Sequence, residues 1–227
     1  MGDISQPQRI IIRNAQQDES KSPSFVTKRD RIAKQYHIIR SWKPRSDVWP
    51  LIVGRGILIG TTVITSLYLN HRFRAKMKIR DYGILPTVLG LAVSPAAVTA
   101  VVHTELVMNK LLLLEIPCPL CIESMSAFMQ TCSGVFLPLI LVPLANFSVT
   151  VGSGVYNVPH ITDIRGIFRR TLSIYQPIFP KIAMIFTFHA LLAGFIAYSE
   201  IKSYLRMLDM QYLMEEEKEQ KLKNNIL

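Results

Sequence analysis

Charged residues are scarce in this sequence, and long stretches hold almost none. Only 19% of the 227 residues are Asp, Glu, Lys or Arg, and no charge occurs between Glu123 and Asp163. A helix needs about 20 consecutive apolar residues to cross a bilayer core of about 30 Å. The shortage of charge therefore excludes an ordinary soluble domain and predicts one membrane domain with tails.

Cysteine is equally rare, and the three present cannot make a disulfide framework. No Ser/His/Asp arrangement, no paired carboxylates and no phosphate-binding glycine loop is recognisable, so we expect neither enzymatic activity nor a cofactor. The first 25 residues have no early apolar core followed by a cleavage site, so no secretory signal is expected. Acidic residues there (Asp3, Asp18, Glu19) also disfavour a removable mitochondrial presequence, and import by internal signals fits better.

Hydrophobic stretches are abundant instead. Four of them, at 49–70, 84–102, 124–145 and 182–199, are each long enough to cross a bilayer, and one is broken by prolines. Because backbone amides in lipid must bond internally, these stretches should be helices. The predicted fold is an all-α membrane protein, a small bundle of about four transmembrane helices with amphipathic N- and C-terminal helices.

The chain divides into three parts on this basis. Residues 1–48 form a polar, basic tail with an interfacial helix at 27–42, residues 49–200 a four-span membrane domain, and residues 201–227 a charged, amphipathic helical tail. Two connections are expected to be irregular: a short basic loop after residue 70, and an interfacial or re-entrant segment at 146–162.

The net charge of +10 comes from basic residues that flank the spans. This placement is typical of membrane topology and of contact with anionic headgroups, and it disfavours nucleic acid as a partner. Candidate contacts with lipid or a partner lie in the two tails. They are the basic Arg29, Arg31 and Lys34, and the apolar stripe of Tyr204, Leu208 and Tyr212.

Small residues recur at a spacing of four within three spans. Such pairs let a neighbouring helix approach closely, so they are candidate packing or partner faces. The pairs are Gly56 and Gly60, Gly90 and Ser94, and Ala190 and Gly194.

Cys118 and Cys121 form a CxxC motif before the third span. Such a pair can be a disulfide or redox clasp, half of a zinc site, or two small residues in a tight turn. No second pair with metal-ligand spacing appears. The sequence leaves the clasp and the tight turn open.

His103 and His189 invite comparison with the paired haem ligands of membrane cytochromes. Their expected depths differ by roughly 18 Å at 1.5 Å per residue, which is too far for one iron. His189 is better explained as a hydrogen-bond donor between helices. Two alternative functions remain: a small transporter or channel, although the spans carry little charge at their centres, and a redox-active membrane protein that acts through Cys118 and Cys121.

The residues also resemble a known family, the transmembrane protein 126 family of metazoan mitochondria. The resemblance rests on the order of several short segments across about residues 50–205: Cys118-Pro-Leu-Cys121, Gly134-Val-Phe-Leu-Pro138, Phe168-Arg169-Arg170, Gln176-Pro177 and Tyr198-Ser-Glu200. It implies a multi-span protein of the mitochondrial inner membrane. It further implies a non-enzymatic assembly factor for respiratory complex I, whose partners are membrane-arm subunits, other assembly factors and inner-membrane lipids.

Overall fold

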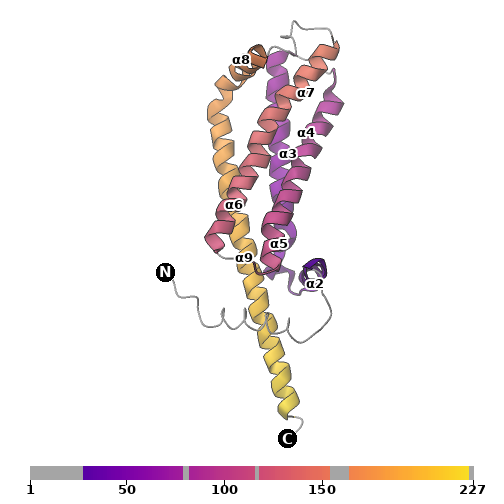
Figure 1. Cartoon of the computed structure of the whole chain (residues 1–227), viewed down its shortest axis with the longest axis vertical. Coiled ribbons are helices and arrows are strands. Elements are labelled where there is room, and N and C mark those ends of the chain that lie inside the picture. The colour runs from indigo at the N-terminus through magenta and orange to yellow at the C-terminus, as the bar shows by residue number, and fades with distance from the viewer. Residues whose placement is uncertain (1–27, 79–81, 116–117, 154–163, 225–227) are drawn as a thin grey trace.

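Four long helical spans run alternately in opposite directions through the computed structural model, which describes residues 28–78, 82–115, 118–153 and 164–224 (Figure 1). The first is α3 (Trp49–Met77), and the second is α4 (Ile84–His103), continued by η2 (Thr104–Met108) and α5 (Asn109–Leu112). The third is α6 (Pro119–Thr131), η3 (Cys132–Phe136) and α7 (Leu137–Ser153), and the fourth is α9 (Phe179–Asn224). Shorter elements are α2 (Lys28–Ser41), η1 (Arg45–Asp47), α8 (Ile164–Tyr175) and η4 (Gln176–Ile178).

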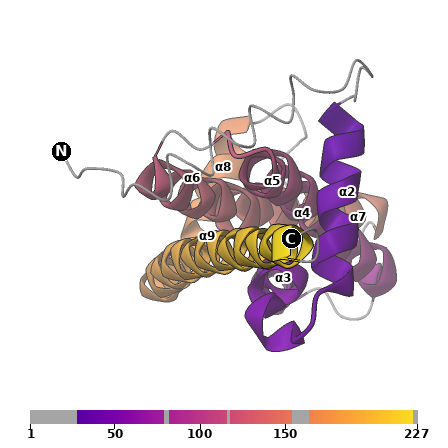
Figure 2. The ribbon, with the colours of Figure 1, turned by 90° about the horizontal axis from the view of Figure 1, so that it is seen from below.

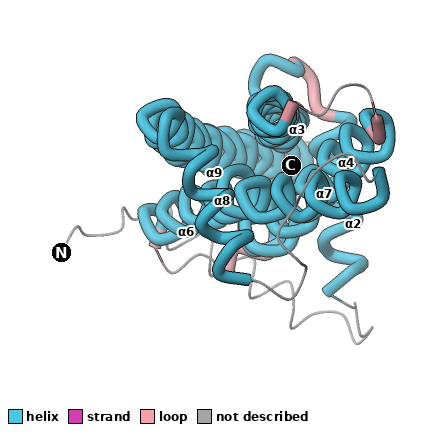
Figure 3. The backbone as a smooth tube through the Cα atoms, turned by 90° about the horizontal axis from the view of Figure 1, so that it is seen from above, coloured by secondary structure: helices cyan, strands magenta, loops and turns pink. Residues whose placement is uncertain are grey.

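The predicted fold class is confirmed. Four helices are long and apolar enough to cross a membrane, and all secondary structure of the described residues is helical (Figure 3). Large apolar side chains such as Ile64, Leu89 and Leu191 are more than 60% exposed on the outside of the bundle. Such a surface is costly in water and suits the hydrocarbon of a bilayer.

The first span is the centre of the bundle. α3 packs against α4, α7 and α9, and one side of it is buried along its length. Towards the end where α7 and α8 lie, Phe73 is fully buried and packs edge-on against Phe147, with ring centroids 5.7 Å apart. Close aromatic contacts of this kind hold helices in register where lipid gives no hydrophobic drive for association.

Two spans contain a π-helical turn. η2 follows His103 directly, and η3 begins at Cys132. A π turn inserts one residue into an α-helix without breaking it, so the second span continues past the predicted exit at residue 102 to Leu112. Such turns often occur at functional positions.

The two connections expected to be irregular are largely helical. α3 extends to Met77, so the basic residues Arg72, Arg74 and Lys76 belong to a helix rather than a loop. α7 extends to Ser153, which puts Asn146 inside a helix; residues 154–162 of the predicted segment lie outside the described residues. Both extensions follow from packing, because Phe73, Met77 and Phe147 fill one apolar cluster that holds the helix ends together.

The N-terminal helix lies across the end of the bundle. α2 covers nearly all of the predicted 27–42 helix and crosses beneath the spans, while α9 is seen end-on (Figure 2). Ile39 is buried in a cluster with α5 and α9, and Lys28 Nζ lies 2.8 Å from Glu115 Oε1. α2 is therefore joined to the bundle as well as being placed at its boundary.

The last helix is far longer than a membrane is thick. α9 has 46 residues, which at 1.5 Å each makes about 69 Å, against about 30 Å of hydrocarbon. Its C-terminal half continues beyond the bundle past α2 (Figure 1). The fourth span and the C-terminal tail are thus one continuous rod.

Candidate functional site

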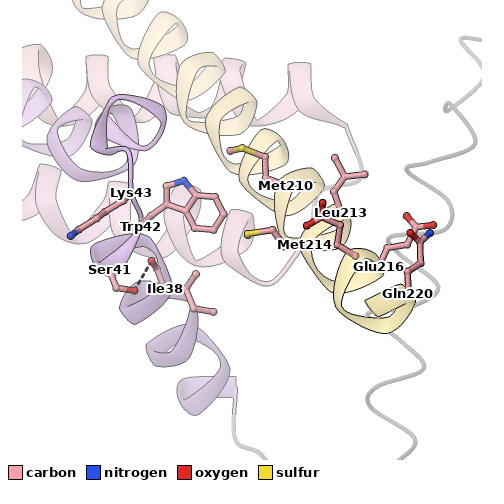
Figure 4. Close-up of a pocket in the computed structure, with 10 residues that line it drawn as sticks. Ile38, Ser41, Trp42, Lys43, Met210, Leu213, Met214, Glu216 and Gln220 are labelled. Atoms are coloured by element: carbon pink, nitrogen blue, oxygen red, sulfur yellow. Dashed lines mark hydrogen bonds between the residues drawn. The ribbon is translucent and has the colours of Figure 1, made fainter. Parts of the chain in front are cut away.

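A groove opens where the end of α2 meets the projecting half of α9 (Figure 4). Its volume is about 700 Å³. Apolar and aromatic side chains form its walls, namely Ile38, Trp42, Met210, Leu213 and Met214. Charged side chains border it: Lys43 on one side, and Glu216 and Glu217 on the other. Flexible methionines beside an aromatic ring can adapt to a partner helix.

The apolar stripe predicted on the C-terminal tail is buried at one end and exposed at the other. Tyr204 is fully buried and its hydroxyl donates to the carbonyl of Leu112 at 3.1 Å, so it belongs to the interior of the bundle. Leu208 is half-buried against the cluster that includes α2. Tyr212 is 41% exposed, so only the part of the stripe beyond Leu208 is free to contact a partner.

The three basic residues predicted to contact lipid or a partner are all on α2. Arg29, Arg31 and Lys34 are exposed on the described helix, consistent with a surface that meets headgroups or another protein. Another exposed basic helix, α8, lies at the opposite end of the bundle and carries Arg165 and Arg169 beside Phe168 and Leu172.

The small-residue pairs face outward. A Cβ added at Gly56, Gly60, Gly90 or Gly194 would meet no atom within 4 Å. Ser94 is exposed and bonds only to its own helix, at the carbonyl of Gly90, and Ala190 is half-buried. The four glycines therefore make no close contact with the part of the chain that the structure describes, and the role of these pairs as a face for partner helices stays a prediction.

Close approach to a polar side chain of α9 occurs at two other glycines. A Cβ at Gly134 would lie 2.7 Å from His189 Nδ1, and one at Gly54 would lie 2.8 Å from Glu200 Oε1. Neither glycine belongs to a GxxxG pair, so spacing alone did not single them out. Their common feature is a buried polar side chain on α9 directly opposite.

His189 is the centre of a polar network between the spans. Gln130 Nε2 lies 3.2 Å from His189 Nδ1, and His189 Nε2 lies 2.9 Å from Thr65 Oγ1. Because an amide nitrogen can only donate, Nδ1 accepts and Nε2 carries the hydrogen that it donates to Thr65. The same amide also donates to Thr62, which links to Thr99. The predicted interhelical hydrogen bond of His189 is confirmed.

His103 faces a carboxylate rather than the other histidine. Its Nε2 lies 3.5 Å from Glu200 Oε2, with both side chains buried. Neither side chain has a hydrogen-bond partner among the described residues, and a cavity of about 10 Å³ adjoins His103. The sequence placed Glu200 just outside the fourth span, but the bundle extends past it, so the membrane domain holds more buried ionisable groups than expected.

A buried cation lies near the C-terminal end of α3. Arg74 is only 6% exposed, and it donates to the carbonyl of Tyr82 at 2.9 Å and to Thr87 at 3.3 Å. Asn146, fully buried, donates to Asn70 Oδ1 at 2.8 Å. These bonds join the ends of α3, α4 and α7, which explains why a strongly basic segment remains helical and packed.

The CxxC motif forms the start of α6. Cys118 is the N-cap, Pro119 takes the first helical position, and the backbone amide of Cys121 donates to Cys118 Sγ at 3.3 Å. A hydrogen bond from the Cys121 thiol, with help from backbone amides, lowers the pKa of the Cys118 thiol below its usual value. All three cysteines are free thiols, and Cys132 lies in η3 beyond the pair. Of the described residues, no three His, Cys, Asp or Glu are grouped so that they could hold a metal ion.

Known proteins match most of this chain. The family described as Transmembrane protein 126 matches residues 32–214. A relative named Transmembrane protein 126, from Drosophila melanogaster, is 32% identical over 215 residues, which cover 92% of this chain and 96% of the relative. No solved structure matches the chain. The residues matched by the family include most of α2, the four spans and most of the groove, and the chain belongs to the transmembrane protein 126 family.

Proposed function

We propose that this protein is a non-enzymatic scaffold of the mitochondrial inner membrane that helps assemble the membrane arm of respiratory complex I. Its partners would be membrane-arm subunits and other assembly factors, in contact with inner-membrane lipids. The observation that carries the scaffold role is the groove between α2 and α9, on a helix that continues well beyond the membrane.

The chemistry of the groove defines the partner it fits. Trp42, Met210 and Met214 form an apolar wall that can adapt its shape to a partner. Glu216 and Glu217 place negative charge along one border of the groove. An amphipathic helix with an apolar face and a basic flank matches both features. The open glycines on the spans, Gly56 and Gly194, would accept a second contact, from a transmembrane helix of the partner.

The test separates complexes on a native gel after mild solubilisation of mitochondria. We expect the protein to comigrate with partial membrane-arm assemblies and not with the mature enzyme. Met214→Glu should abolish comigration, because a charge in the groove removes an apolar contact and costs on the order of 2 kcal/mol or more. Leu222→Glu is the matched control, since Leu222 is 65% exposed on the same helix and does not line the groove.

Three results would contradict the proposal. Comigration with the mature enzyme would make the protein a subunit or a retained factor. Migration alone, near its own mass with detergent, would remove the partners. Equal behaviour of Met214→Glu and Leu222→Glu would show that the groove is not the docking surface.

A transporter is the second candidate, favoured by the buried pair of Glu200 and His103. Ionisable residues inside a membrane domain often mark an ion or substrate path. Liposomes that contain only this chain distinguish the two functions. Flux that is lost in Glu200→Gln would replace the scaffold proposal.

A further inference from the structure

The two sulfurs of the CxxC motif are held in unequal environments at the start of a helix. Cys118 occupies the N-cap position, outside the first turn of α6, and its sulfur accepts a hydrogen bond from the Cys121 amide at 3.3 Å. Cys121 is exposed and lies one turn into the helix. Hydrogen bonds to the N-cap sulfur and the helix dipole both favour a thiolate at Cys118.

We propose that Cys118 and Cys121 are a redox-active dithiol that exchanges with a disulfide of a partner protein, with Cys118 as the attacking and Cys121 as the resolving cysteine. This activity is independent of the scaffold role. The pair lies at the same end of the bundle as α2 and the projecting half of α9, where a partner can reach it (Figure 1).

The exchange proceeds in two balanced steps. The Cys118 thiolate attacks one sulfur of the partner disulfide, forms a mixed disulfide, and releases the other partner sulfur, which takes up a proton. Cys121 then loses its proton and attacks Cys118 Sγ, which breaks the mixed disulfide and releases the second partner sulfur as a thiol. Two electrons pass from the Cys118/Cys121 dithiol to the partner, and the chain retains an intramolecular disulfide.

The geometry favours exchange over the other uses of a CxxC motif. A structural zinc site has four ligands, and the described residues bring no third His, Cys, Asp or Glu to the pair. Cys121 follows Cys118 by one helical turn, and its backbone amide lies 3.3 Å from Cys118 Sγ, so a single turn holds the two cysteines next to each other. Pro119 at the first helical position and the exposure of Cys121 keep the motif accessible at the start of the span.

Glutathione redox buffers test the proposal on the purified full chain in detergent. As oxidised glutathione increases, wild type should lose two alkylatable thiols together, through one intramolecular disulfide. Cys121→Ser should instead keep one glutathione on Cys118 as a stable mixed disulfide. Cys118→Ser should hold far less glutathione, and Cys132→Ser should behave as wild type because Cys132 takes no part.

The outcomes divide cleanly. Wild type that keeps both thiols at every buffer ratio would overturn the proposal. Equal glutathione loading of Cys121→Ser and Cys118→Ser would also overturn it, because Cys118 would then not be the attacking cysteine. In mitochondria, Cys121→Ser should accumulate an adduct that dithiothreitol removes and that is absent from the double variant. An adduct formed equally by the double variant would also overturn it.

Discussion

Glu200 Oε2 lies 3.5 Å from His103 Nε2, and both side chains are buried between α9, α3 and the π turn that follows α4. Arg55 lies close by on α3, where its guanidinium donates to Thr104 at 3.1 Å. A buried acid and a buried base that face each other offset part of the free energy that each side chain loses when it leaves water. The pair therefore links the fourth span to the end of α4.

Replacement of either member should destabilise the protein more than replacement of both. His103→Leu or Glu200→Leu leaves one polar group buried without its partner and should cost about 1–2 kcal/mol. The double variant replaces the pair by apolar side chains and should cost much less than the sum. Unfolding by denaturing detergent measures all three, with the exposed Glu105→Gln as a control. Additive losses would show that the two residues do not interact.

Gly134 should be intolerant of any side chain, whereas Gly56 should accept one. Gly134→Ala places a methyl group 2.7 Å from His189 Nδ1, in a ring held by hydrogen bonds on both nitrogens. We expect a loss of about 1–3 kcal/mol from overpacking. Gly56→Ala meets no atom within 4 Å and should be neutral, or stabilising by about 0.5–1 kcal/mol through helix propensity. Thermal unfolding in detergent compares them, and equal effects would contradict the close approach.

The number and order of the spans could be predicted from the sequence, because a bilayer imposes a length on each apolar stretch. The ends of the helices could not. Arg74 and Glu200 carry charges that local composition assigns to loops or tails, yet contacts with Asn146 and His103 bury them. Such pairings join residues more than 70 positions apart, and a hydropathy pattern carries no information about them.

The candidate site was predictable to a similar degree. Cys118 and Cys121 and the basic face of 27–42 were visible as local patterns, but the groove was not, because it needs α2 and α9 side by side. The same packing explains the mixed outcome for the C-terminal stripe, in which Tyr204 is covered and Tyr212 is not. The GxxxG pattern predicts a helix face made of small residues, but it does not predict whether that face packs against another helix of the same chain.

The Cys118 thiol should react at lower pH than an ordinary thiol. The hydrogen bond from the Cys121 thiol lowers the pKa of Cys118, so its reactive thiolate is present at a pH where an unperturbed thiol is still protonated. Cys121→Ala removes that bond and should move the pH profile of alkylation upward. Iodoacetamide labelling followed residue by residue in mass spectra measures it, and a profile that does not move would assign the lowered pKa to another cause.

Asn146 should matter for packing and not for glycosylation, although Asn146-Phe-Ser148 is a glycosylation sequon. The Asn146 side chain is fully buried in α7 and bonds to Asn70, whereas Ser148 is exposed and bonds only to the carbonyl of Ala145. Asn146→Leu and Ser148→Ala both destroy the sequon. Only Asn146→Leu should lower stability, by about 1–3 kcal/mol, because it leaves buried polar partners unpaired. Thermal unfolding and treatment with an endoglycosidase check both expectations, and a mass decrease on treatment together with equal effects of the two variants would contradict them.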